Sequence, residues 1–228
     1  MDQAMMISYR FLFPNNREEF IEVKIDKQTM ESLPDDSVTP PEWSKLEFHQ
    51  CPNCPLRAIP QPWCPLAVRL VKLMTTCRNV LSYDEVKMEV TTPERMVTKN
   101  TTAQRAVSSL MGLVMATSGC PHMLFLKPMA RYHLPFATQE ETIFRVVSTY
   151  LLEQYFRHKK ALSTDLELEN LKKIYAEIQI VNMAMTSRLR TICVQDSAVN
   201  AVVLLDIFAK LLPSSVEDSL EDLRYLFI

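Results

Sequence analysis

The sequence predicts an α+β fold, with a small N-terminal antiparallel β portion packed on a bundle of four to five helices. Short apolar alternations near the N terminus predict strands, and apolar residues at helical spacing after residue 101 predict helices. The strands come first and the helices later, which favours α+β over alternating α/β. We expect residues 1–100 to hold β-hairpins and a Cys-Pro-rich metal loop, and residues 101–228 to form the helical bundle of one continuous domain.

The N-terminal strands are predicted from side chains that alternate between apolar and polar. This pattern covers residues 7–13 and 21–25, with the turn signal Pro14-Asn15-Asn16 between them, and predicts a hairpin with one apolar face. A second strand pair is expected over residues 86–90 and 96–98.

The chain between the two strand pairs begins with a polar connector over residues 27–50. The stretch from Cys51 to Ala67 then has five prolines in 17 residues, which excludes a helix or a central strand there. A short helix is expected over residues 66–74.

The helical part is predicted from capping boxes and stop signals. A Ser or Thr followed three residues later by Glu or Gln caps a helix start, and glycine favours a helix end. The expected helices run from Thr101 (with Gln104) to Ser118-Gly119, from Thr138 (with Glu141) to about Arg157, from Thr164 (with Glu167) to about Arg190, from Asp196 or Ser197 to before Pro213, and from Ser214 or Ser215 onward.

Composition excludes several classes of function. The 228 residues contain only two glycines, Gly112 and Gly119, so no dinucleotide fingerprint, P-loop or nucleophile elbow can be written, and no nucleotide cofactor is expected. A net charge of −2 gives no reason to expect a nucleic-acid partner. No apolar run reaches the roughly 18 residues of a membrane span. The start has an acid and no basic lead, so we expect no membrane partner and a reducing, cytoplasmic location.

Four of the six cysteines share one local context. Cys51, Cys54, Cys64 and Cys120 are each followed by proline, whereas Cys77 and Cys193 are not. A Cys-x2-Cys pair with a third cysteine on the same loop and a fourth from a distant loop is typical of one metal centre. The pair spacing favours zinc, while the adjacent prolines and apolar neighbours favour an iron–sulfur cluster. A third alternative is that the cysteines are buried or reversibly oxidised and hold no metal.

Two histidines stand next to the predicted ligands. His49 lies two residues before Cys51, and His122 lies two residues after Cys120. Either could replace a cysteine as ligand or donate a hydrogen bond to a thiolate. The alternative for His49 is a solvated loop side chain.

Arg131 and His133 are the candidates for chemistry outside the cysteines. They follow Cys120 on the loop between two predicted helices, and they could bind an anion or act in acid–base catalysis. An ion pair of Arg131 with Glu140 or Glu141 is the simpler alternative. Arg188 stands in an apolar helix face, and a buried charge needs a partner, for which we expect Asp196 or Asp206.

Several short strings resemble a family of bacterial proteins that carry a domain of unknown function. They are CPNCPL, CPLA, SGCPH, PMARYHLPFA and LDIFAKLL, and they extend over most of the chain. The resemblance implies a bacterial source and no particular activity.

Three functions remain open at this point. The first is a metal-containing cytosolic protein that binds or regulates an unknown protein partner and is not an enzyme. The second is an iron–sulfur redox protein or metalloenzyme that uses the Arg131 and His133 loop. The third is a structural protein that assembles with itself by strand addition at the edge of the N-terminal hairpin.

Overall fold

The structure is a computed structural model that describes residues 3–35 and 37–227, with the side chains of residues 211–219 left aside. It confirms the α+β fold. Four antiparallel strands form one sheet in the order β2-β1-β3-β4. Their bounds are β1 Ala4–Leu12, β2 Glu18–Asp26, β3 Glu85–Thr91 and β4 Met96–Thr102.

Both predicted hairpins are present, and they join into one sheet through β1 and β3. Tyr9 pairs with Ile21 of β2 on one side and with Val90 of β3 on the other. Alternate residues of β1, namely Met5, Ile7, Tyr9 and Phe11, are buried on the face that the helices cover. The period-2 pattern read from the sequence is therefore the pattern of burial.

One edge of the sheet is partly covered by the chain that follows it. After β2 the chain turns back, so that Leu33 N donates to Lys24 O at 2.7 Å and Ser32 forms a bridge with Ile25. This pairing shortens the free edge on which strand addition by another copy would depend.

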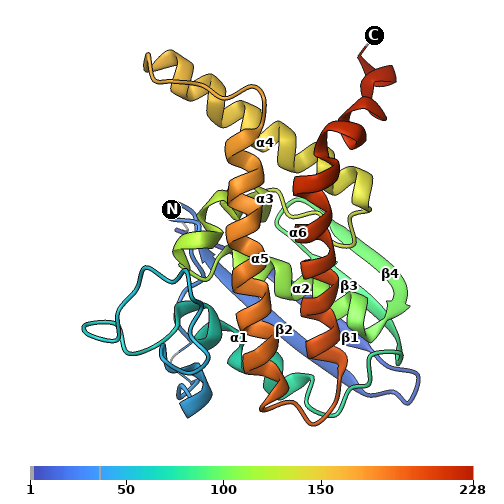
Figure 1. Cartoon of the computed structure of the whole chain (residues 1–228). Helices are drawn as coiled ribbons and strands as arrows, with labels where there is room; N and C mark the ends of the chain where they lie inside the picture. Colours follow the sequence, from blue (N-terminus) through green and yellow to red (C-terminus); the bar gives the residue numbers. More distant parts are fainter. Residues whose placement is uncertain (1–2, 36, 228) are drawn as a thin grey trace.

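Six α-helices and three short 3₁₀ helices complete the secondary structure of the described residues (Figure 1). The α-helices are α1 Pro65–Thr76, α2 Ala103–Ala116, α3 Lys127–Arg131, α4 Gln139–Lys159, α5 Glu169–Arg190 and α6 Ser197–Glu221. The 3₁₀ helices are η1 Glu42–Ser44, η2 Pro121–Leu126 and η3 Arg224–Leu226. Helix α2 contacts the sheet and α6, and α5 and α6 run side by side in front of it.

The predicted helix starts have different outcomes. Thr138 and Glu141 form the expected capping box at the start of α4, with both reciprocal hydrogen bonds present. The box predicted at Thr101 and Gln104 is wrong, because α2 begins one residue later and its N-cap, Thr102, makes no side-chain capping bond. The first N–H of α2 is instead paired with a backbone carbonyl from outside the helix, since Ala103 N donates to Asp84 O.

The start of α5 is also later than the sequence predicted. The helix begins at Glu169 rather than at Thr164 with Glu167. Leu168, the residue before the helix, has a left-handed φ of 62°. The Asp165 carboxylate accepts hydrogen bonds from the Tyr150 hydroxyl and the Asn170 N–H. Residues 164–168 therefore form a loop that Asp165 holds in place.

The predicted break before Pro213 is wrong as well. Helix α6 continues through Pro213 to Glu221 and replaces the two helices expected there. A proline inside a helix removes one hydrogen bond and costs about 3 kcal/mol, but it does not always end the helix. The earlier turns of α6 are anchored by the buried Ala198, Ala201 and Val202.

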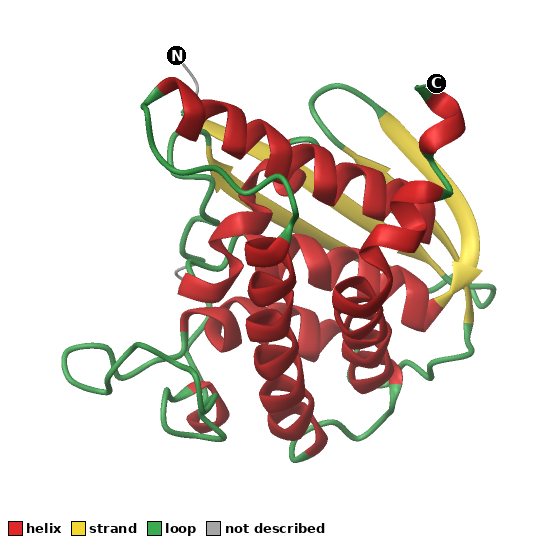
Figure 2. Cartoon of the chain, turned by 45° about the horizontal axis from the view of Figure 1, so that its top comes forward, coloured by secondary structure: helices red, strands yellow, loops and turns green. Residues whose placement is uncertain are grey.

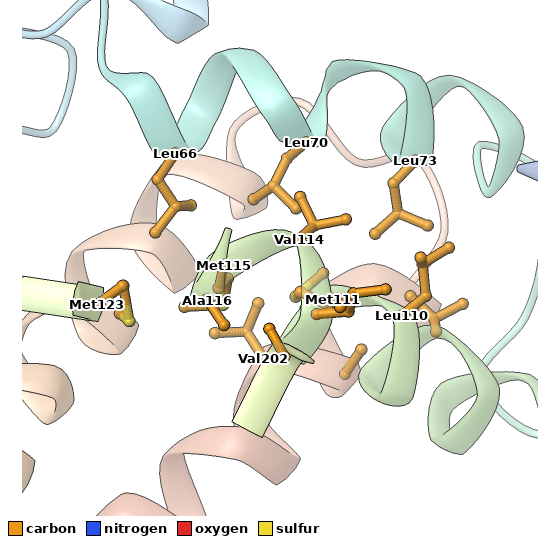
Figure 3. Close-up of a cluster of buried hydrophobic side chains, with 14 of the residues drawn as sticks. Leu66, Leu70, Leu73, Leu110, Met111, Val114, Met115, Ala116, Met123 and Val202 are labelled. Carbon is orange, nitrogen blue, oxygen red and sulfur yellow. The ribbon is translucent and has the colours of Figure 1, made fainter. Parts of the chain in front are cut away.

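The helices lie on one face of the sheet, and the core extends through both parts of the chain (Figure 2). In Figure 3, Leu66, Leu70 and Leu73 of α1 point toward Leu110 and Val114 of α2. All five of these side chains are 5% exposed or less. The sheet, α1 and α2 therefore share one hydrophobic cluster with α5 and α6.

No single helix among the described residues is long and apolar enough to cross a membrane. Only α2 taken together with residues 121–131 meets the length and composition of a span, and the two are bent by 110°.

Candidate metal centre

The Cys-Pro-rich segment forms a closed loop. Leu46 N donates to Pro62 O at 2.8 Å, and Cys64 N donates to Ser44 O at 2.9 Å, so the two ends of residues 46–62 lie side by side. A bridge between Lys45 and Trp63 reinforces the closure. Because prolines remove backbone donors, the loop is held mainly at its neck rather than by internal pairing.

Three of the four predicted ligands begin a turn or a helix. Cys51 and Cys54 are joined by a turn in which Cys54 N donates to Cys51 O at 3.0 Å. Cys64 is the buried N-cap of α1, and Cys120 is the N-cap of η2. At Cys64 and Cys120 the following proline occupies the first helical position, where its missing N–H costs nothing.

The structure brings the four Cys-Pro cysteines into one neighbourhood. Burial is the main cause that raises the pKa of Cys51, to about 12, and charge on Cys64, Cys120 and Cys54 adds to it. Burial likewise raises the pKa of Cys120 to about 11, while the backbone N–H groups of His122 and Met123 act in the opposite direction. Thiols that influence one another in this way come from segments that are far apart in the sequence.

The thiols do not, however, form a closed ligand set. All six cysteines are free thiols. Among the residues that the structure describes, no group of three or more His, Cys, Asp or Glu side chains is arranged to hold a metal ion. The donor chemistry suits a soft metal, and binding would have to draw the sulfur atoms closer together.

Arg188 of α5 clamps the neck of the cysteine loop. Its Nη1 donates to Trp43 O at 2.7 Å and to Lys45 O at 2.8 Å, and its side chain is almost fully buried. The ion pair expected with Asp196 or Asp206 is therefore wrong. Backbone carbonyls accept from the two Nη atoms of this guanidinium instead, while its buried Nε has no hydrogen-bond partner among the described residues. Burial lowers the pKa of Arg188, and charge on Cys64, Cys51 and Cys54 acts in the opposite direction.

The two aspartates expected to pair with Arg188 have other partners. Asp196 accepts Ser82 N and Ser82 Oγ, and Asp206 pairs with Lys210 one turn later on α6. Neither carboxylate contacts Arg188, because the guanidinium donates to main-chain carbonyls instead.

His122 connects the cysteine turn to the helices. Its Nε2 is hydrogen-bonded to Asn53 O at 2.8 Å, and its Nδ1 lies 3.7 Å from the Glu177 carboxylate. Asn53 Nδ2 in turn donates to Glu177 Oε2. His122 on η2 thus contacts the turn between Cys51 and Cys54.

The remaining predicted site residues each have a different partner. His49 is exposed and contacts the ring of Phe48. Arg131 pairs with Glu94 at 3.0 Å rather than with Glu140 or Glu141. His133 is hydrogen-bonded to the Tyr9 hydroxyl, and its side chain lines a cavity between the helices.

Cys77 and Cys193 differ from the other cysteines in the structure, as they do in the sequence. Cys77 is the buried C-cap residue of α1, and Cys193 follows the end of α5. Burial raises the pKa of both thiols, to about 12 for Cys77.

Two residues that sequence reasoning missed complete the site. Asn53 and Glu177 hold the cysteine turn against α5, although they are 124 positions apart in the chain. The only local signal was that Asn53 lies between two Cys-Pro pairs, and nothing in the sequence pointed to Glu177.

Comparison with known proteins gives one match. The model of a family described as a domain of unknown function (DUF6901) matches residues 7–228. No curated protein and no solved structure matches the chain.

Proposed function

We propose that this chain, which belongs to the DUF6901 family, is a metal-containing binding or regulatory protein whose centre is held by Cys51, Cys54, Cys64 and Cys120. The observation that carries the proposal is the convergence of these four thiols. They come from a closed loop, from the start of α1 and from the start of η2. Even so, charge on Cys54, Cys64 and Cys120 raises the pKa of Cys51, and charge on Cys54 and Cys64 raises that of Cys120.

The chemistry of the donors supports a thiophilic metal. Four thiols suit either a zinc ion or an iron–sulfur cluster, and both require deprotonated sulfur. Burial opposes the charged form of Cys51 and Cys120, so the bound metal would supply the compensating positive charge. The Arg188 guanidinium adds a positive charge near Cys51, Cys54 and Cys64.

The setting supports an architectural role for the centre. Arg188 and the contacts of Asn53 with Glu177 already tie the loop to α5, and His122 ties it to η2. A metal shared by Cys120 and the loop cysteines would strengthen this connection, because the free energy of binding becomes free energy of folding. The loop would then present a fixed surface to a partner protein.

The test is metal analysis of the full-length chain purified without oxygen. We expect zinc, or iron with sulfide, at about one centre per chain. Replacing one thiolate, as in Cys54→Ser, should reduce the bound metal at least about tenfold, since even supporting residues have effects of that size. Cys193→Ser is the matched control and should keep the full content.

The outcome also separates the other hypotheses. Brown protein whose colour bleaches on reduction would favour the iron–sulfur redox function. Protein that holds no stoichiometric metal, or a Cys54→Ser variant with unchanged metal, would contradict the shared centre. Colourless protein with zinc agrees with a structural centre.

A further inference from the structure

A cavity of about 520 Å³ lies between α2, α5, α6 and the segment that leads from α3 into α4. Small-molecule sites occupy about 300–1,000 Å³. The four Cys-Pro cysteines are not among the residues that line the cavity, so it is a second site rather than part of the first.

Part of the cavity wall is apolar and carries one buried amide. Met115, Met123 and Ile178 line it and are buried. Asn182 of α5 also lines it and is 1% exposed, and its Oδ1 has no hydrogen-bond partner among the described residues. Leaving a buried carbonyl oxygen without a partner costs about 1–3 kcal/mol. A ligand that donates an O–H or N–H would satisfy it.

The mouth of the cavity is positively charged. Lys99 on the edge strand β4 and Arg105 in the first turn of α2 are exposed there, and Arg145 of α4 is half-buried. Within the described part of the chain, no Asp or Glu lines the cavity and Arg105 takes part in no ion pair. Glu141 acts on Lys99 and Arg145, but its carboxylate is held by the N–H of Thr138 in the capping box.

His133 contributes polarity to the wall without adding charge. Burial, helped by the positive charge of Arg145, lowers its pKa to about 4, so the ring is neutral at pH 7. Its Nε2 is hydrogen-bonded to the Tyr9 hydroxyl, which also contacts Ser109 Oγ at 3.2 Å. The positive potential of the cavity therefore comes from lysine and arginine alone.

We propose that this cavity binds a small amphipathic carboxylate. The apolar body lies against the methionines and Ile178, the carboxylate meets Arg105 and Lys99 at the mouth, and a hydroxyl or N–H group on the body donates to Asn182 Oδ1. Each part of this ligand complements a feature of the cavity. The body complements the apolar surface, the carboxylate complements the cations without carboxylate partners, and the donor group complements the unpaired buried acceptor.

The first test is calorimetric titration of the full-length chain with straight-chain carboxylates of six to twelve carbons, the matching primary alcohols and the matching ω-hydroxy acids. We expect a carboxylate to bind about tenfold more tightly than its alcohol, because it adds a charge-assisted contact. We also expect at least one ω-hydroxy acid to bind more tightly than its parent acid.

Substitutions assign the two polar contacts. Arg105→Met should lower the affinity for the carboxylates about tenfold and change the affinity for the alcohols by no more than about twofold. Arg78→Met, on an exposed residue outside the cavity, is the matched control and should change neither. Asn182→Leu should remove the advantage of the ω-hydroxy acid while the plain acid still binds.

Three results would overturn the proposal. They are the absence of binding across the whole series, equal affinities for acids and alcohols, and equal effects of Arg105→Met and Arg78→Met. Circular dichroism of each variant confirms that the fold is intact before its affinity is compared.

Discussion

At the scale of single residues, Arg188 ties the neck of the cysteine loop to α5. It is 1% exposed and donates hydrogen bonds to three backbone carbonyls that lie close together in the chain, those of Trp43, Lys45 and Leu46. Its place in an apolar helix face marked it in the sequence as a buried charge that needs partners. The partners themselves are backbone atoms more than 140 positions away, which no residue pattern reveals.

We predict that Arg188→Leu lowers the free energy of unfolding by about 3 kcal/mol, because it leaves buried carbonyls without donors. Urea denaturation followed by circular dichroism measures this change. The matched control is Arg190→Leu, on the exposed residue two positions later, which should change stability by no more than about 0.5 kcal/mol. Equal losses in the two variants would show that the carbonyl contacts of Arg188 contribute little.

At the scale of elements, the two glycines of the chain differ in whether their position tolerates a side chain. Gly112 lies inside α2, and a Cβ placed there would meet the nearest side-chain atom, Leu205 Cδ2, at an ordinary 3.7 Å. Gly119 follows α2 with a φ of 79°, where side chains other than glycine are strained. The sequence identified Gly119 as the stop signal of this helix, and the structure agrees, since α2 ends at Ala116.

We predict that Gly112→Ala raises the free energy of unfolding by up to about 1 kcal/mol and that Gly119→Ala lowers it by about 1 kcal/mol. The first change removes the flexibility of a glycine inside a helix, and the second forces a Cβ into a left-handed conformation. Thermal unfolding of the two variants beside the parent chain measures both. Changes of the same sign would contradict this account of α2 and its end.

At the scale of the whole molecule, Tyr9 joins the sheet to the helices through two polar contacts. His133, beyond the end of α3, is hydrogen-bonded to Tyr9 on β1, and Tyr9 also contacts Ser109 on α2. Because burial lowers the pKa of His133 from 6.5 to about 4, the folded protein disfavours protonation of a ring that the unfolded chain protonates readily. We therefore expect this contact to weaken when His133 is protonated.

The sign of the pH dependence follows from the lowered pKa. The stability that neutral His133 provides is fully present above pH 6.5 and is lost as the pH falls toward about 4. We predict a loss of at most about 3 kcal/mol across this window. The free energy of unfolding of His133→Gln should change less over the same pH range. The difference between the pH dependences of the variant and the parent chain therefore isolates the contribution of this residue. Parallel curves would show that His133 titrates normally in the folded protein.

The cysteine site and the cavity are built on the same two elements. Helix η2 is capped by Cys120 and contributes Met123 and Leu126 to the cavity, and α5 carries both Asn182 and Arg188. The two sites are therefore neighbours in the fold, although sequence reasoning found the cysteines and not the cavity. A cavity depends on which helix faces meet, and this is set by packing between segments that are distant in the chain.

The sequence by itself determined the fold class, the four strands, the capping box of α4 and the separation of the Cys-Pro cysteines from Cys77 and Cys193. These depend on local periodicity and on neighbouring residues, which a sequence displays directly. Only the tertiary structure decided that β3 pairs with β1, that Arg188 takes backbone acceptors and that α6 continues through Pro213. In each of these cases the deciding contact joins segments far apart in the chain or offsets a local preference, and burial rather than local pattern sets the outcome.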